Sequence, residues 1–191
     1  AAAIEYLLGL YSTQINQVQL NLLDSHDTAR FLTLARGDES ALRLAVLFVM
    51  CFPGAPCIYY GDEVGMEGGR DPDCRRSFSW EAGRWNRDLR DYFKRCIALR
   101  KSHPALRRGE FRTLLAQNDL YCFGRRLDGE TVVCALNTGA GPRPLDIPVE
   151  GYLPARTVLH GVWDEGEARV RAGRLSGLTL PPRSGVVLVQ G

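Results

Sequence analysis

The feature that most constrains this fold is a strand–helix–strand unit in the first third of the chain. An apolar stretch over residues 18–23 predicts a short strand. Asp38 then has the position of a helix N-cap before an apolar stripe, and the Pro-Gly-Ala-Pro cluster at 53–56 ends that helix. A second buried strand is predicted over residues 57–60. Two strands joined in this way through a helix are parallel, so this part of the chain is predicted to be α/β.

Both predicted strands are followed by acidic residues. His26 and Asp27 come after the first strand, and Asp62 and Glu63 come after the second. In parallel α/β folds, reactive groups gather beyond the carboxyl ends of the strands. This placement distinguishes these four residues from other polar residues of the chain.

The His26-Asp27 pair allows two interpretations. A carboxylate can bridge two vicinal hydroxyl groups of a sugar by charge-assisted hydrogen bonds, with the imidazole beside it. Alternatively, Asp27 caps the following turn and His26 bonds to the backbone. A zinc site needs more ligands, and the other histidines, His103 and His160, have surface or helix-end positions, so no metal site is predicted.

A long loop over residues 64–86 carries a second polar group. Asp71 and Arg75 are four residues apart, and Trp80 follows closely. Acid, guanidinium and indole together form a common sugar-binding set, although the same charges also suit a loop held together by its own salt bridges. Glu63 likewise has a structural alternative, as a buried acid paired with an arginine.

The second half of the chain changes character near residues 106–109. A strong amphipathic helix over residues 88–102 is predicted to turn Tyr92 and Phe93 inward and Arg100 outward. From Gly109 onward, short alternating stretches are separated by turns, which predicts an antiparallel β-sandwich. The stretches are EFRTLLA, LYCFGRRL, TVVCALN, RPLDIPV, ARTVLH and GVVLVQ. We therefore expect two domains, residues 1–108 and 109–191.

Composition excludes several classes of partner. The 24 basic and 22 acidic side chains leave a formal charge of +2, which requires neither nucleic acid nor an anionic membrane. The longest apolar run, residues 44–52, is shorter than the ~20 residues of a membrane-spanning helix. The six cysteines lack a C-x-x-C pair, so we expect free thiols and a cytoplasmic location.

Three stretches, in order, closely resemble the α-amylase family of glycoside hydrolases. They are SHDTARFLTL, PGAPCIYYGDEVGMEGGRDPDCRRSFSW and IALRKSHPALRRGEF, and the resemblance runs over residues 21–109. Neopullulanases, cyclomaltodextrinases and maltogenic amylases are the most similar members. The resemblance implies the C-terminal fragment of a (β/α)₈ TIM barrel, about its last two strands and helices, followed by an antiparallel β-sandwich.

The resemblance also implies roles for particular residues. Asp27 matches the aspartate that holds hydroxyls of the cleaved sugar and stabilises the transition state, and His26 matches a histidine that binds the same ring. Asp71 and Arg75 match a pair that contacts a glucose unit further along the donor side.

Two more positions match the family, and no cofactor is implied. Glu63 matches a supporting glutamate at the end of the eighth strand. Arg30 matches the motif in residue type, without an assigned contact.

The mechanism implied is retention through a nucleophile and an acid/base placed ~5–5.5 Å apart. In the family both precede the His-Asp motif, and the roughly twenty residues before His26 contain neither pattern. We therefore expect a fragment of a hydrolase acting on α-1,4 and also α-1,6 glucosidic bonds, inactive in isolation. The expected partners are an α-glucan, maltooligosaccharide or cyclodextrin substrate and the missing N-terminal barrel portion, or a second copy.

Two alternatives remain. A glucanotransferase or a sucrose- or trehalose-active relative shares the motifs, but the GGRDPDCRR loop favours the cyclodextrin and pullulan group. The other alternative is a non-catalytic module from Gly109 onward that stabilises a partner or binds glycan. Its candidate aromatic platforms are Tyr152 and Trp163, and each is predicted to be half-buried.

Overall fold

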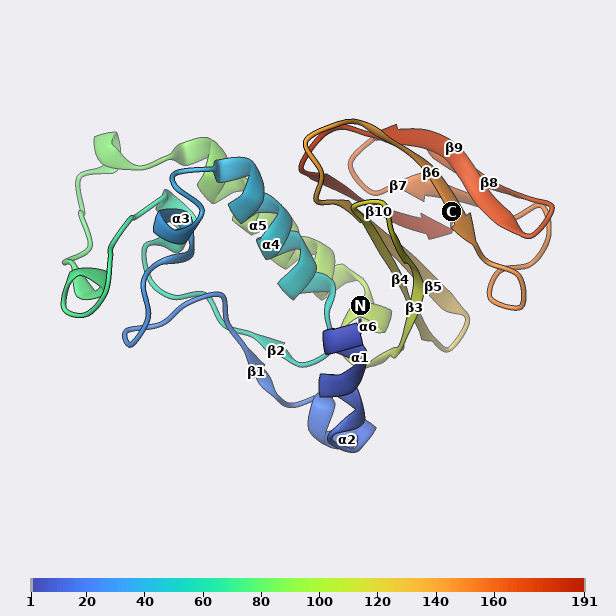
Figure 1. Ribbon diagram of the computed structural model, residues 1–191, viewed down its shortest axis with the longest axis horizontal. Helices are drawn as coiled ribbons and strands as arrows, with labels where there is room; N and C mark the ends of the chain where they lie inside the picture. The colour runs from blue at the N-terminus through green and yellow to red at the C-terminus, as the bar shows by residue number, and fades with distance from the viewer. Residues whose placement is uncertain (1, 191) are drawn as a thin grey trace.

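The computed structural model describes residues 2–190 and contains a helical part beside an antiparallel β-sheet (Figure 1). Ala1 and Gly191, the outer residues of the two predicted domains, lie outside the described residues. Within residues 2–190, no helix is both long and apolar enough to cross a membrane.

The helical part confirms the predicted strand–helix–strand order. Its first elements are α1 (Ala2–Gly9), α2 (Thr13–Asn16), β1 (Leu20–Asn21), α3 (Phe31–Leu34), α4 (Glu39–Cys51) and β2 (Ala55–Pro56). The two strands pair in parallel, with Leu20 opposite Ala55 and Asn21 opposite Pro56. Asp38 caps α4 as predicted, because its carboxylate accepts a hydrogen bond from the Ala41 N–H at 3.1 Å.

The two parallel strands are shorter than the sequence pattern predicts. The prediction of a strand over residues 57–60 was wrong, since the ladder on that side covers only Ala55–Pro56. A parallel strand is held by neighbours on its two edges, and among the described residues each of these strands has a neighbour on one edge. The apolar segment after β2 therefore continues as irregular backbone.

The chain then passes through three single-turn 3₁₀ helices to the second long helix. The elements are η1 (Asp62–Val64), η2 (Asp73–Arg75), η3 (Ala82–Arg84), α5 (Arg87–Ser102) and α6 (Pro104–Arg108). Asn86 caps α5 by accepting a hydrogen bond from the Leu89 N–H at 3.0 Å. The restricted backbone before Pro104 ends α5, and the chain turns into α6.

The rest of the chain forms one folded antiparallel sheet. Its strands are β3 (Glu110–Gln117), β4 (Leu120–Leu127), β5 (Glu130–Asn137), β6 (Arg143–Pro148), β7 (Val158–Gly161), β8 (Glu167–Arg171), β9 (Arg174–Leu180) and β10 (Ser184–Gln190). The spatial order is β3-β4-β5-β10-β7-β8-β9-β6. The predicted stretches correspond to six of these, whereas β8 and β9 were not predicted because charged residues and an internal Gly177 weaken their alternation.

Side chains of the central strands are buried on both faces. Val133 and Val186 face a core shared with β6–β9, which makes this region a sandwich. Their neighbours Val132 and Val187 face the opposite way and pack with the helices α4, α5 and α6. Successive side chains of a strand point to opposite faces, so one set of strands builds two cores and joins the two parts of the molecule.

The predicted outward orientation of Arg100 was wrong. This side chain is buried, and its guanidinium donates hydrogen bonds to the carbonyl oxygens of Met50 at 2.7 Å, Phe52 at 3.0 Å and Leu106 at 3.0 Å. It also donates to the carbonyl of Gly54, just before β2. The last carbonyls of a helix lack intrahelical partners, and Arg100 supplies the donors for the end of α4.

Arg125 on β4 also donates to backbone carbonyls at the end of α4, and it does so from the β-sheet. It is fully buried and donates to the carbonyl oxygens of Cys51 at 2.7 Å, Leu106 at 2.8 Å and Gly109 at 2.9 Å. Burial lowers the pKa of Arg125 to about 10, so the guanidinium stays charged at neutral pH. The Leu106 carbonyl accepts from both arginines.

All six cysteines are free thiols, as predicted. Cys57 is exposed, and the other five are buried. Burial raises the pKa of the Cys96 and Cys122 thiols to about 12, which keeps them in the unreactive protonated form.

We expect Arg100→Met to lower the free energy of unfolding by about 3 kcal/mol or more, because several buried carbonyls lose a charged donor. Urea denaturation followed by circular dichroism measures this loss. The control is Arg169→Met, since Arg169 is an exposed strand residue paired with Glu167 and should cost less than about 1 kcal/mol. Equal effects of the two substitutions would contradict the proposed importance of the buried guanidinium.

Candidate functional site

The candidate site lies on the segment that follows β1. The Asp27 N–H donates to Ser25 Oγ at 3.2 Å, and the Ser25 N–H donates to Thr28 Oγ1 at 3.0 Å. These bonds fold residues 25–28 into a compact turn. The turn leaves the side chains of His26 and Asp27 64% and 70% exposed, so both are available to a ligand.

Arg75 connects this turn to the long loop. Its Nε donates to the His26 carbonyl at 3.0 Å and lies 2.8 Å from Asp71 Oδ1. Its Nη2 lies 3.7 Å from Asp27 Oδ1, and His26 Nε2 lies 3.4 Å from Asp27 Oδ2. The structure thus brings the four predicted residues from two separate segments together on one exposed surface. The Cys74 thiol, which also donates to the His26 carbonyl at 3.2 Å, was not predicted to take part.

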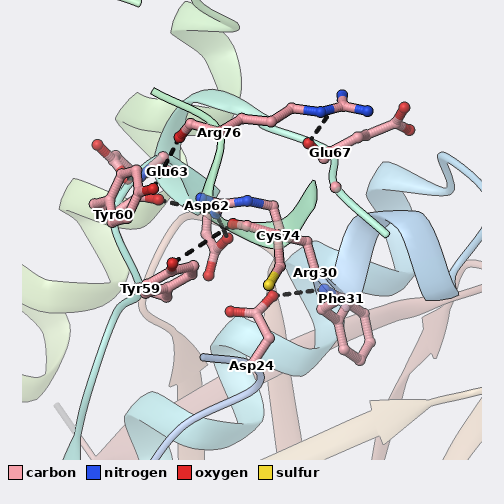
Figure 2. Close-up of polar contacts among 12 residues, drawn as sticks. Asp24, Arg30, Phe31, Tyr59, Tyr60, Asp62, Glu63, Glu67, Cys74 and Arg76 are labelled. Atoms are coloured by element: carbon pink, nitrogen blue, oxygen red, sulfur yellow. Dashed lines mark hydrogen bonds and ion pairs between the residues drawn. The ribbon is translucent and has the colours of Figure 1, made fainter. Parts of the chain in front are cut away.

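Arg30 is buried beneath this surface. Its Nη1 lies 2.9 Å from Asp62 Oδ1 and donates to the Tyr60 carbonyl at 2.9 Å (Figure 2). The guanidinium carbon also lies 4.5 Å from the ring centre of Tyr59 and 4.9 Å from that of Tyr60. A fully buried side chain with these contacts does not reach a ligand at the surface, so Arg30 acts on the arrangement of the site.

Glu63 makes its hydrogen bond within its own turn and not with the four residues of the exposed surface. Its Oε2 accepts a hydrogen bond from the Gly61 N–H at 2.8 Å within the turn that begins η1 (Figure 2). The structural alternative considered for Glu63, a buried acid paired with an arginine, describes its neighbour Asp62 instead.

The sequence reasoning missed the buried acid Asp24, and it singled out Asp62 without predicting that this acid is buried. Asp24 is 3% exposed and Asp62 is 6% exposed. Asp24 Oδ2 accepts a hydrogen bond from the Phe31 N–H at 2.5 Å. Burial and the neighbouring Asp24 raise the pKa of Asp62 to about 8, against the lowering effect of Arg30. Their position directly after buried segments was a usable signal, but it does not tell an inward carboxyl from an outward one.

The aromatic part of the loop packs mainly against itself. The ring centre of Trp80 lies 4.9 Å from that of Phe78, and Phe78 lies 5.8 Å from Trp85. The Tyr60 hydroxyl donates to the Arg76 carbonyl at 2.8 Å, which ties the loop to the segment after β2 (Figure 2). Trp80 itself is 84% exposed, and it has no contact with Asp71 or Arg75 that would support the acid–guanidinium–indole set, which was one of two interpretations of this loop.

The family model described as "Alpha amylase, catalytic domain" matches residues 2–108, which is more than half of the chain. The chain belongs to the α-amylase family. Residues 111–188 match the model described as "Neopullulanase-like, C-terminal domain". The predicted fold class is therefore confirmed: part of an α-amylase catalytic domain followed by an antiparallel β-domain.

Relatives of this α-amylase family chain carry names in the predicted subgroup. Neopullulanase 2 of Thermoactinomyces vulgaris is 43% identical over 186 residues, an alignment that covers 95% of the chain and 31% of the relative. A cyclomaltodextrinase of Geobacillus thermopakistaniensis is 40% identical over 152 residues, covering 78% and 26%. The chain thus spans about a quarter to a third of these relatives.

A solved relative shares the three-dimensional arrangement. The crystal structure of a debranching enzyme from Nostoc punctiforme superimposes with a TM-score of 0.86 at 41% identity. The match covers 98% of this chain and 38% of the debranching enzyme. The arrangement described for residues 2–190 is therefore that of the matching part of a larger α-amylase family protein.

The two arginines of the site should differ in their effect on stability. We expect Arg30→Met to cost about 3 kcal/mol or more, because it leaves a buried carboxyl without its cation. Arg75→Met should cost less than about 1 kcal/mol, because its ion pairs are half-exposed. Urea unfolding of both variants checks this, and a larger loss for Arg75→Met would contradict the assignment of a buried and a surface role.

Proposed function

We propose that this chain is the C-terminal part of the catalytic unit of an α-glucan hydrolase, and that Asp27 and His26 bind the sugar at the cleaved bond. Asp71 and Arg75 bind a neighbouring sugar unit in this proposal. The observation that carries it is the meeting of these four exposed side chains beyond β1, with Arg75 bridging the two acids. The names of the relatives, neopullulanase and cyclomaltodextrinase, support the substrate class.

The chemistry of the site suits a sugar whose ring gains positive charge. The exposed Asp27 carboxylate can accept hydrogen bonds from two adjacent hydroxyls, and its negative charge favours an oxocarbenium-like transition state. Arg75 limits the movement of this carboxylate by pairing with it and with the backbone of the same turn. The nucleophile and the acid/base of the retaining mechanism are not assigned to residues 2–190.

The proposed substrates are α-1,4-linked maltooligosaccharides and cyclodextrins, with α-1,6 bonds as in pullulan. A cytoplasmic location is proposed because the chain carries free thiols and because relatives include an intracellular maltogenic amylase of Bacillus subtilis. We also propose the domain boundary at residues 108–109. The last helix ends at Arg108 and the first strand of the sheet begins at Glu110.

The N-terminal part has apolar surface that a covalent or associated partner would cover. The exposed fractions are 68% for Tyr6, 58% for Leu7, 74% for Val18 and 63% for Leu20. The described residues give β1 and β2 one strand neighbour each, so their outer edges are free to pair. We propose that the preceding portion of a barrel covers this surface, with self-association as the outcome when that portion is absent.

The isolated chain should hydrolyse neither cyclodextrin nor pullulan above the blank. Co-expression with the residues of Thermoactinomyces neopullulanase 2 that precede its aligned region should restore hydrolysis. In the restored complex, Asp27→Asn should lower kcat by about 10²–10³-fold, because a charge that stabilises the transition state is lost. Reducing-sugar release measures all three results.

The matched control for that experiment is Asp146→Asn, which changes an exposed carboxylate of β6 that pairs with Arg174. It should leave turnover unchanged. Turnover by the isolated chain that Asp27→Asn abolishes would contradict the proposed division of catalytic groups, and full activity of Asp27→Asn in the complex would contradict the role of Asp27.

The non-catalytic glycan-binding alternative has little support from the sandwich. Tyr152 is 6% exposed and lies under Arg126, whose guanidinium carbon is 4.4 Å from its ring centre. Trp163 packs against Tyr92, with ring centres 5.8 Å apart. We expect a polypeptide of residues 109–191 to show no retention on immobilised amylose, and retention comparable to a starch-binding domain would favour the alternative.

A further inference from the structure

Two buried acids lie beside one buried cation below the turn that carries Asp27. Asp24 and Asp62 come from the segments that follow β1 and β2, and their side chains point toward one another beside Arg30 (Figure 2). Arg30 is the guanidinium that forms an ion pair with Asp62. Two ionised carboxylates and one guanidinium would leave a net negative charge in the interior, which is costly.

The burial of both acids and an oxygen without a donor point to a proton between them. Figure 2 shows the carboxyl groups of Asp24 and Asp62 turned toward one another, and two carboxyl groups can share a hydrogen bond only when one of them is protonated. Without that proton, Asp24 Oδ1 has no donor among the described residues, although it is fully shielded from solvent. A shared proton satisfies this oxygen and makes the group of three neutral.

The same acids hold both ends of the segment that presents Asp27. Asp24 Oδ2 accepts the Phe31 N–H at 2.5 Å and so closes residues 24–31 into a loop. Arg30, near the end of this loop, is fixed by Asp62 Oδ1 and the Tyr60 carbonyl, each at 2.9 Å. A change in either acid therefore acts directly on the backbone that carries Asp27.

We propose that Asp24 and Asp62 are positioning residues that share one proton, and that loss of this proton in alkali loosens the Asp27 turn. The effect on catalysis rests on the proposed sugar-binding function of Asp27, whereas the sharing of the proton does not.

The surroundings of the pair keep the proton in place through neutral pH. Burial raises the pKa of Asp62 to about 8, and the hydrogen bond and charge of Asp24 add to this effect while Arg30 opposes it. The titratable groups facing the pair from the β2 side and from η2 are Tyr59, Tyr60 and Cys74. The other side is lined mainly by apolar side chains, among them Leu23, Met50 and Phe93, and by one further titratable group, the Cys57 thiol.

The linkage has a definite sign. The folded chain keeps on Asp62 a proton that the unfolded chain loses near pH 4. The stabilisation from the protonated pair is therefore complete below about pH 4, decreases as pH rises, and is lost above about pH 8. A substitution that removes this titration should flatten the pH dependence of Tm over that window.

Carbon-13 NMR of the 191-residue chain, labelled at the aspartate carboxyls, tests the proton directly. We expect one proton on the Asp24–Asp62 pair with a midpoint near pH 8. The amide signals of residues 25–28 should shift with the same midpoint. The proposal is overturned if both carboxyls are ionised at pH 6, or if the turn amides do not follow the titration.

Asp62→Asn is the matching variant, because the amide can donate a hydrogen bond to Asp24 in place of the shared proton. We expect the midpoint near pH 8 to disappear and the turn amides to keep their neutral-pH positions in alkali. Asp91→Asn, an exposed acid of α5 paired with Lys94, is the control and should leave the midpoint unchanged. The wild-type titration decides the question even if Asp62→Asn does not fold.

The activity of the co-expressed complex separates this inference from the proposed function. If the shared proton and the proposed function are both correct, kcat of the wild-type complex falls in alkali with a midpoint near pH 8. Asp62→Asn then removes this fall and changes kcat at neutral pH by less than about threefold. A shared proton in the isolated chain together with an inactive complex would count against the proposed function alone. An unchanged alkaline fall in Asp62→Asn would overturn the positioning role.

Discussion

The structure depends on two buried guanidinium groups between its helical part and its sheet. Arg100 and Arg125 donate to the carbonyls that end α4, to the Leu106 carbonyl of α6 and to the backbone just before β2. Buried carbonyls without donors destabilise a fold, and here neither a following helix nor a strand supplies them. Because Gly54 leads into β2, these bonds also fix the start of the segment that carries Asp62.

Buried polar groups also need partners in the candidate site, but there the groups are carboxyls and a guanidinium instead of carbonyls. Where the chain leaves β1, one acid is turned inward and another outward. The inward acid, Asp24, accepts a backbone hydrogen bond and points toward Asp62 (Figure 2), while Asp27 stays exposed beside Arg75. In this proposal burial makes the inner group depend on a shared proton and on Arg30, whereas exposure leaves the Asp27 side chain accessible to a ligand. The exposed surface proposed to bind sugar thus lies above a buried group that a shared proton would make neutral.

Several predictions from local pattern are confirmed by the structure. The alternation and turn signals predicted the sandwich, the predicted cap Asp38 starts the first long helix, and three motifs in order identified the family. The resemblance also singled out His26, Asp27, Asp71 and Arg75, and the structure brings these four side chains together. These properties depend on neighbours within one or two turns or on family resemblance, and both are present in a single sequence.

Other properties depend on distant residues and could not be predicted from the sequence. Arg100 has the spacing of an outward residue, yet it turns inward because carbonyls some fifty positions earlier in the chain need donors. The strand expected over residues 57–60 has no ladder, because pairing depends on neighbours and not on apolar character alone.

The sequence by itself determined the fold class, the family and the residue types of the site. Only the tertiary structure decided which acids are buried, which arginine is exposed and which acids lie together beside Arg30 (Figure 2). The physical reason is that solvation and charge compensation act through space. Asp24 and Asp62 lie far apart in the chain, and they meet beside Arg30 (Figure 2) only after folding brings the ends of β1 and β2 together.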